Sequence, residues 1–187
     1  MAEPLDPPLR VDWIEAAELG DGRPGRLGLT FLPGKRGASL RYPGLVYRRE
    51  LASDVRTLLE DGVTRLVLLV EDTELERWGD PDIVQAAAAA GLDVRRFPMP
   101  DGEPPTSIEE MDAILAALDE ARVDGDAAVA CMGGVGRTGT VAACALVRAG
   151  VPPRDAIERV RDVRHPEAVE TRSQERFVAA YAARRHA

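Results

Sequence analysis

The sequence predicts an α/β protein with a single domain, in which a mostly parallel central sheet is flanked by helices. Two observations support this prediction. Helical and strand-like segments alternate between residues 49 and 99, the pattern of right-handed crossovers in a parallel sheet. The strand candidates at 64–70 and 127–130 are almost wholly apolar, as expected for strands buried on both faces.

Each element follows from the spacing of apolar residues and from the turn residues between them. Residues 1–10 are typical of a loose N-terminal arm, and apolar runs at 11–16 and 27–32 predict two short strands joined by a turn. Helices are expected at 49–62, 81–90, 108–118, 138–147, 153–163 and 173–185, and strands at 64–70, 94–99 and 127–130. No internal repeat, linker or low-complexity tract divides residues 1–187, so one domain is expected.

Composition and charge restrict the function. The formal net charge is −8 and the pI is about 4.9, which argues against nucleic acid or an anionic membrane as a general partner. Two cysteines and two histidines make neither a disulfide framework nor a metal-type cluster, so no metal or cofactor is expected. No signal peptide and no run of about twenty apolar residues is found, so we expect a soluble cytoplasmic protein with reduced thiols.

The chemistry is concentrated in residues 131–139, CMGGVGRTG, where a buried strand turns into a helix. Three glycines let the backbone turn several N–H groups toward one point, and the following helix directs the positive end of its dipole there. Arg137 adds a charged fork that can bind two oxygens of a tetrahedral anion. Cys131 lies at the mouth of this loop, where a positive field favours thiolate over thiol. The stretch therefore combines a nucleophile with a phosphate-binding loop.

This spacing of cysteine, five residues, arginine and threonine resembles the signature of the cysteine-dependent protein phosphatases. FPMPDGEPP, about thirty residues before Cys131, resembles the general-acid loop of their dual-specificity branch. LGLTFLPGKR and AVETRSQERF resemble segments of its kinase-associated phosphatase-like members. The resemblance implies the cysteine-phosphatase fold and a phosphomonoester hydrolase. The expected substrate is a phosphorylated protein, with phosphotyrosine first and phosphoserine or phosphothreonine as further candidates.

The resemblance also implies roles for individual residues. Cys131 would attack phosphorus and form a phosphocysteine intermediate. Arg137 would hold the equatorial phosphoryl oxygens. Asp101 would protonate the leaving oxygen and later deprotonate water; a solvated turn aspartate is the alternative, and Glu103 is its nearest competitor. The remaining phosphate contacts would come from the backbone N–H groups of Met132, Gly133, Gly134, Val135 and Gly136.

Three further residues carry open interpretations. Thr138 Oγ is expected to donate a hydrogen bond to the cysteine sulfur, to act as helix N-cap, or both. Gln174 resembles a glutamine that some relatives use to place the hydrolytic water, although a polar face on the last helix is the simpler interpretation. Cys144 is expected to fill the core, with a regulatory disulfide to Cys131 as the alternative.

The chain departs from the family at one position, because Ala130 stands where family members usually carry a histidine that supports the loop. The basic loop at 33–37 either lies near the site or is an ordinary solvated turn. No lysine lies between Cys131 and Arg137, which favours a phosphoprotein over an inositol lipid as substrate.

Other functions remain as alternatives. Residues 134–139 also match the G-x-G-x-x-G fingerprint of dinucleotide-binding proteins, but a second helix-like segment follows where that unit needs a strand. A sulfurtransferase also places a cysteine in an anion-binding loop, usually without the paired acid loop. A catalytically silent phosphoprotein-binding module is the third alternative.

Overall fold

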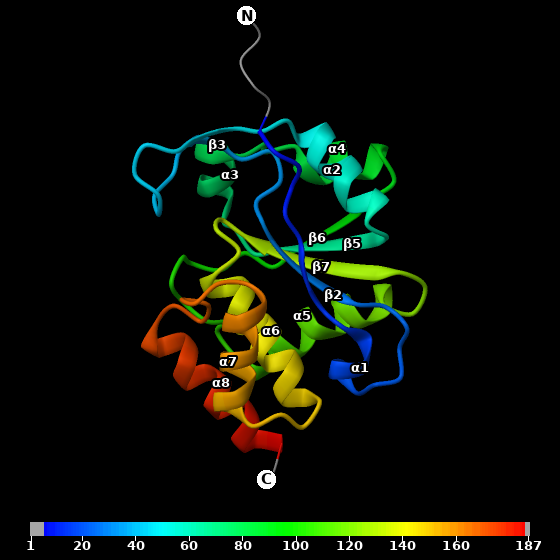
Figure 1. The fold of residues 1–187 in the computed structure, drawn as a ribbon, viewed down its shortest axis with the longest axis vertical. Helices are drawn as coiled ribbons and strands as arrows, with labels where there is room; N and C mark the ends of the chain where they lie inside the picture. Colours follow the sequence, from blue (N-terminus) through cyan, green and yellow to red (C-terminus); the bar gives the residue numbers. More distant parts are fainter. Residues whose placement is uncertain (1–5, 186–187) are drawn as a thin grey trace, which may run out of the picture.

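A five-stranded sheet forms the centre of the computed structural model, which describes residues 6–185 (Figure 1). The strands lie in the order β1-β2-β7-β5-β6. Only β1 runs antiparallel to its neighbour; the pairs β2–β7, β7–β5 and β5–β6 are parallel. Their bounds are Asp12–Ile14 for β1, Leu27–Phe31 for β2, Val63–Leu68 for β5, Asp93–Arg96 for β6 and Asp126–Cys131 for β7. The predicted α/β fold with a mostly parallel sheet is confirmed.

Helices cover both faces of this sheet (Figure 1). One face carries α2 (Leu51–Glu60), α3 (Asp72–Trp78) and α4 (Ile83–Ala89); the other carries α1 (Ala16–Leu19), α5 (Ile108–Ala121), α6 (Gly136–Arg148), α7 (Pro153–Val163) and α8 (Arg172–Arg185). The most buried helix is α6, in which every residue from Gly136 to Val147 is buried. Its small alanine and glycine side chains allow α7 and α8 to pack around it.

The central strand β7 positions the functional loop. Residues 127–130 are fully buried, and their backbone pairs with β2 on one side and with β5 on the other. Because these three strands are parallel, their carboxyl ends, Phe31, Cys131 and Leu68, lie at one edge of the sheet. Ligands bind at this edge in open α/β sheets.

Several local features differ from the expectations. Two short helices, α1 and α3, were not expected; each begins with a capping box, formed by Glu15 with Glu18 and by Glu71 with Glu74. The segment between β2 and α2 contains a hairpin of β3 (Arg36–Ala38) and β4 (Val46–Arg48) instead of an open loop. The last helix begins one residue earlier than expected.

The expectation of a loose arm at residues 1–10 is wrong for its second half. Leu9 is buried in the core, and the carbonyl of Arg10 accepts a hydrogen bond of 2.8 Å from Thr30 Oγ1. Apolar burial therefore holds this segment against β2. Residues 1–5 lie outside the described residues.

Between residues 6 and 185, no helix is both long enough and apolar enough to cross a bilayer.

Candidate active site

A cavity of about 370 Å³ opens at the carboxyl edge of the parallel strands. It brings together residues from the loops after β2, β3, β6 and β7 and from the loop between α7 and α8. Its lining consists of Lys35, Leu40, Arg41, Asp101, Cys131, Met132, Gly133, Val135, Gly136, Glu167 and Glu170. Four of the five residues expected to offer backbone N–H groups to phosphate, Met132, Gly133, Val135 and Gly136, are among them.

Cys131 is the last residue of β7, and the loop after it turns directly into α6. The turn needs Gly134, whose φ is +65°; a Cβ at this position would lie 2.4 Å from the carbonyl oxygen of Thr30. Only glycine fits that backbone and that space. The helix begins at Gly136 instead of Thr138, so the free N–H groups of its first turn belong to the loop itself.

Arg137 is fully buried and fixed by two other segments, α3 and the loop after β6. Its guanidinium donates two hydrogen bonds of 2.7 Å to the carboxylate of Glu74 and one of 3.0 Å to the carbonyl of Met99. Burial alone would lower the pKa of Arg137, but the hydrogen bonds to Glu74 and the charges of Cys131, Glu74 and Asp101 raise it. The residue therefore stays a fixed cation at the base of the loop.

Glu74 is a site residue that the sequence analysis missed. It lies on α3, where its carboxylate also accepts a hydrogen bond of 2.8 Å from the backbone N–H of Glu71. Burial acts to raise the pKa of this carboxyl, yet the hydrogen bond from Arg137 outweighs burial and the pKa is lowered. In the sequence it is one acid among several in VEDTELERWGD, so no local signal separates it from its exposed neighbours.

Asp101 lies in the loop that leaves β6, at the mouth of the cavity. Its carboxylate is 3.1 Å from Arg137 Nη2, while 70% of its side chain remains exposed. Glu103, its competitor in the sequence analysis, is exposed and does not line the cavity. Of the two acids, Asp101 is the one that faces the loop of residues 131–137, here called the cysteine loop.

Thr138 is the third residue of α6 and is fully buried. Val135 occupies the N-cap position, so the N-cap alternative for Thr138 is wrong. The helix starts two residues earlier than expected, at Gly136. Among the described residues, Thr138 Oγ1 has no hydrogen-bond partner. The expected bond to the sulfur is therefore not formed in this structure.

Gln174 is fully buried near the start of α8, which overturns its interpretation as part of a polar outer face. Its Oε1 accepts hydrogen bonds from the backbone N–H groups of Glu170 and Thr171, at 2.8 and 3.2 Å. Its Nε2 faces the cysteine loop, since a Cβ on Gly136 would lie 3.2 Å from it. The fold thus places this amide beside the loop.

Lys35, the single lysine of the chain, places a second cation at the site. It is buried, and its Nζ donates a hydrogen bond of 3.1 Å to the carbonyl of Met132. Burial lowers the pKa of Lys35 to about 8, although the charge of Cys131 acts in the opposite direction. Of the two interpretations of the basic loop at 33–37, proximity to the site is therefore confirmed for Lys35.

The loop between α7 and α8 supports the cysteine loop from outside. Arg164 donates a hydrogen bond of 3.0 Å to the carbonyl of Gly134 and pairs at 2.7 Å with Asp12 of β1. Val169 has φ +59°, the one positive φ outside glycine in the described chain, and its N–H donates to the carbonyl of Val135 at 3.3 Å. A branched residue holds such a backbone only where its surroundings impose it.

Cys144 of α6 packs in the hydrophobic core of the protein, as expected. It is fully buried, and burial raises the pKa of its thiol. Both cysteines are free thiols, so the alternative of a disulfide with Cys131 is not what this structure contains.

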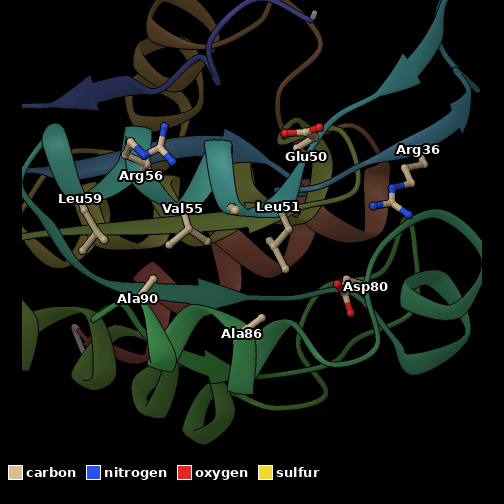
Figure 2. Close-up of a pocket in the computed structure, with 10 residues that line it drawn as sticks. Arg36, Glu50, Leu51, Val55, Arg56, Leu59, Asp80, Ala86 and Ala90 are labelled. Atoms are coloured by element: carbon tan, nitrogen blue, oxygen red, sulfur yellow. The ribbon is translucent and has the colours of Figure 1, made fainter.

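A larger cavity, of about 680 Å³, lies between α2 and α4 and contains no cysteine (Figure 2). Leu51, Val55 and Leu59 of α2 point toward Ala86 of α4 and Ala90 just after it, with charged side chains at the rim. It offers apolar walls but no nucleophile. Within residues 6–185, no group of three or more His, Cys, Asp or Glu side chains could hold a metal ion.

Comparison with known proteins agrees with this geometry. The profile of the PTP-SAK family, described as Swiss Army Knife protein, DSP-PTPase phosphatase domain, matches residues 45–178. The chain belongs to this family. The PTP-SAK chain is thus a phosphatase of the cysteine-dependent, dual-specificity type.

Individual relatives extend the likeness over nearly the whole PTP-SAK chain. Cyclin-dependent kinase inhibitor 3 from Rattus norvegicus is 27% identical over 184 residues, covering 94% of this chain and 81% of the relative. The crystal structure of Tk-PTP in its active form is 30% identical, with a TM-score of 0.67 over 86% of this chain and 93% of that one. Kinase associated phosphatase, crystallised with serine in place of its catalytic cysteine, shares the fold: the TM-score is 0.83 at 23% identity, over 97% and 98% of the chains.

Proposed function

We propose that this PTP-SAK phosphatase hydrolyses phosphate monoesters on proteins through a phosphocysteine intermediate on Cys131. One observation carries the proposal: Cys131 and Asp101, which come from different segments, line a single cavity at the carboxyl edge of the sheet, and the buried guanidinium of Arg137 lies 3.1 Å from the Asp101 carboxylate. A thiol nucleophile, a fixed cation for the phosphoryl oxygens and an exposed carboxyl are the groups that a two-step ester hydrolysis needs.

In the first step, the thiolate of Cys131 attacks phosphorus in line with the leaving oxygen. The S–P bond forms while the P–O ester bond breaks, and Asp101 donates a proton to the departing alkoxide or phenoxide. The loop's N–H groups and Arg137 hold the equatorial oxygens, where negative charge is greatest. Because Glu74 fixes the guanidinium beforehand, no reorganisation of Arg137 is needed at that moment.

In the second step, water attacks the phosphocysteine. Asp101, now ionised, accepts a proton from the water while the S–P bond breaks. Inorganic phosphate leaves, and the Cys131 thiolate is regenerated. We assign Gln174 to orienting this water, because its amide lies beside Gly136. We assign Thr138 to stabilising the departing thiolate, because its buried hydroxyl has no hydrogen-bond partner among the residues described and can donate to the sulfur when charge develops there.

A phosphoprotein fits the mouth of this cavity better than an inositol lipid. Asp101, Glu167 and Glu170 line it, and both cations other than Arg137 are already engaged: Lys35 by the Met132 carbonyl, and Arg41 by Glu167 and Glu170. A polyanionic headgroup would meet these carboxylates. The relatives named for inhibiting a cyclin-dependent kinase also support a protein substrate.

The dinucleotide-binding alternative lacks support from the sheet. In the described chain, α6 is followed by α7 and α8, with no further strand to complete a βαβ unit.

The decisive experiment compares wild type with Cys131→Ser. The wild type should release phosphate from phosphopeptides, and the serine variant should release none while still binding them. Side-by-side turnover of phosphotyrosine, phosphoserine and phosphothreonine peptides would rank the substrates. Binding without turnover by the wild type would instead identify a silent phosphoprotein-binding module, and full turnover by Cys131→Ser would rule out the proposed intermediate.

A further inference from the structure

Exposed apolar side chains gather beside the catalytic cavity. Across residues 6–185, the large hydrophobic side chains that remain exposed are Leu40, Tyr42, Leu45, Val46 and Val123. Four of the five lie in residues 39–46, between β3 and the first residue of β4, here called the hairpin tip. Val123 lies after α5, near the amino end of β7 and therefore at the opposite edge of the sheet. Single exposed apolar residues are ordinary, whereas a local group of them indicates a binding surface.

The hairpin tip has a defined shape. The N–H of Leu45 donates to the carbonyl of Tyr42 at 3.1 Å, and Gly44 between them has φ +85°, as in a type II turn with proline at its second position. Ser39 Oγ accepts hydrogen bonds from the N–H groups of Arg41 and Tyr42, at 3.3 and 2.9 Å. The apolar side chains are thus presented by an ordered turn.

Contacts to the loop between α7 and α8 fix the hairpin tip beside the active site. Arg41 pairs with both Glu167 and Glu170, and Tyr42 Oη lies 3.2 Å from His165 Nε2. The same loop touches the cysteine loop at Val135. A two-stranded hairpin by itself is marginally stable, so these contacts keep the tip in place. A surface that is already ordered loses less entropy when it binds.

The hairpin tip is continuous with the site of the reaction. Leu40 and Arg41 line the same cavity as Cys131 and Asp101. When a phosphorylated side chain enters this cavity, the residues next to it in the substrate must pass over its rim. Leu40, with 73% of its surface exposed, is then the apolar side chain that they meet first.

We propose that the hairpin tip is a docking surface for apolar side chains that flank the phosphorylated residue of a protein substrate. The proposal rests on the proposed phosphatase function and adds the class of sequence that the enzyme prefers. A membrane is a poorer occupant, because Asp101, Glu167 and Glu170 at the same mouth repel an anionic surface. Lys35 and Arg41, which would attract one, are already engaged within the protein.

The test uses two phosphotyrosine peptides that differ only in having leucine or serine on both sides of the phosphotyrosine, together with a small aryl phosphate. Partial burial of one leucine side chain predicts that the wild type prefers the leucine-flanked peptide on the order of tenfold in kcat/KM. The double variant Leu40→Ser/Leu45→Ser should bring this ratio within about twofold of unity. Val123→Ser, a change at an exposed apolar residue far from the site, should keep the wild-type ratio.

The outcomes separate this inference from the function on which it rests. If the wild type hydrolyses the aryl phosphate but treats both peptides alike, the docking surface is refuted and the phosphatase stands. The docking surface is also refuted if the double variant keeps the preference. Absence of hydrolysis of all three compounds would overturn both proposals.

Two further measurements test other occupants. Binding of the wild type to vesicles of phosphatidylcholine and a phosphoinositide, lost in the double variant, would assign the hairpin tip to a membrane and overturn the inference. If sedimentation shows a dimer for the wild type and a monomer for the double variant, the hairpin tip binds a second copy of the chain. This result would also overturn the inference. A monomeric wild type that does not bind such vesicles supports the inference.

Discussion

At the level of single residues, the active site depends on how a few charges are held. Arg137 is buried, and its guanidinium binds the carboxylate of Glu74 on α3. The carboxylate of Asp101, in the loop after β6, contacts the same guanidinium. A buried cation is costly unless it is paired and hydrogen-bonded, so Glu74 stabilises both the fold and the geometry of the site.

Glu74→Gln tests this arrangement, because glutamine keeps a side-chain acceptor and the capping box but loses the charge. We expect the free energy of unfolding to fall by about 2 to 4 kcal/mol and kcat/KM to fall more than about tenfold. Urea denaturation and steady-state kinetics measure the two effects. Glu76→Gln, an exposed acid on the same helix, is the control and should change neither; equal behaviour of the two variants would contradict the assigned role of Glu74.

Asp101→Asn tests the acid. Loss of general acid–base catalysis should lower kcat on the order of a hundredfold, with little change in KM. Glu103→Gln is the matched control, since this exposed neighbour does not line the cavity. A larger fall in kcat for Glu103→Gln than for Asp101→Asn would transfer the role to the other acid.

At the level of elements, the cysteine loop is a strand-to-helix connection supported on several sides. β2 lies against Gly134, Arg164 holds the loop carbonyls, and the loop between α7 and α8 covers the start of α6. Because these contacts are tight, neighbouring glycines in the loop differ in whether they can accept a side chain. Gly134 has a left-handed backbone and no room for a side chain, whereas a Cβ on Gly133 would meet only Val135 Cγ2, at 3.9 Å.

Gly134→Ala should therefore distort the loop and Gly133→Ala should not. We expect Gly134→Ala to lower the free energy of unfolding by about 2 to 4 kcal/mol, from backbone strain and the clash with the Thr30 carbonyl, and to abolish phosphate release. For Gly133→Ala the stability should change by less than about 1 kcal/mol. Thermal and urea unfolding of the pair give the comparison, and similar losses in both variants would refute the steric argument.

At the level of the whole molecule, folding brings a lysine into a buried position beside the site, and global stability acquires a dependence on pH. The pKa of Lys35 is about 8 in the folded protein, against an ordinary value of 10.5. Between these values the unfolded chain binds more protons than the folded one, so the contribution of Lys35 to stability increases as pH rises. The penalty for the buried charge is fully present below pH 8 and is relieved above it.

Comparison of wild type with Lys35→Met isolates this effect from other titrating groups. From pH 7 to pH 9, the free energy of unfolding of the wild type should rise by roughly 1 kcal/mol relative to the variant. Urea denaturation at both pH values measures it. Arg36→Met, at the exposed neighbouring residue, should show no such relative change, and parallel curves for wild type and Lys35→Met would contradict the buried charge.

The α/β class and the loop at 131–139 could be predicted from the amino-acid sequence, because both depend on local patterns. Apolar runs identify strands such as β5 and β7, and the spacing of cysteine, glycines and arginine is set by the geometry of one turn. The two short helices and the hairpin escaped prediction, since each is too short to show a periodic apolar pattern and is stabilised by capping or by contacts with distant loops.

The contacts that distant residues make with that loop became visible only in the folded chain. Glu74 lies 63 residues before its partner Arg137 in the sequence, and Lys35 lies 97 residues before Met132. Arg164 likewise reads as an ordinary polar residue until helix packing brings it to the loop, and Gln174, which the family resemblance had suggested, is placed beside the loop by the fold. Contacts between segments so far apart arise from chain topology, which leaves no local pattern in the sequence.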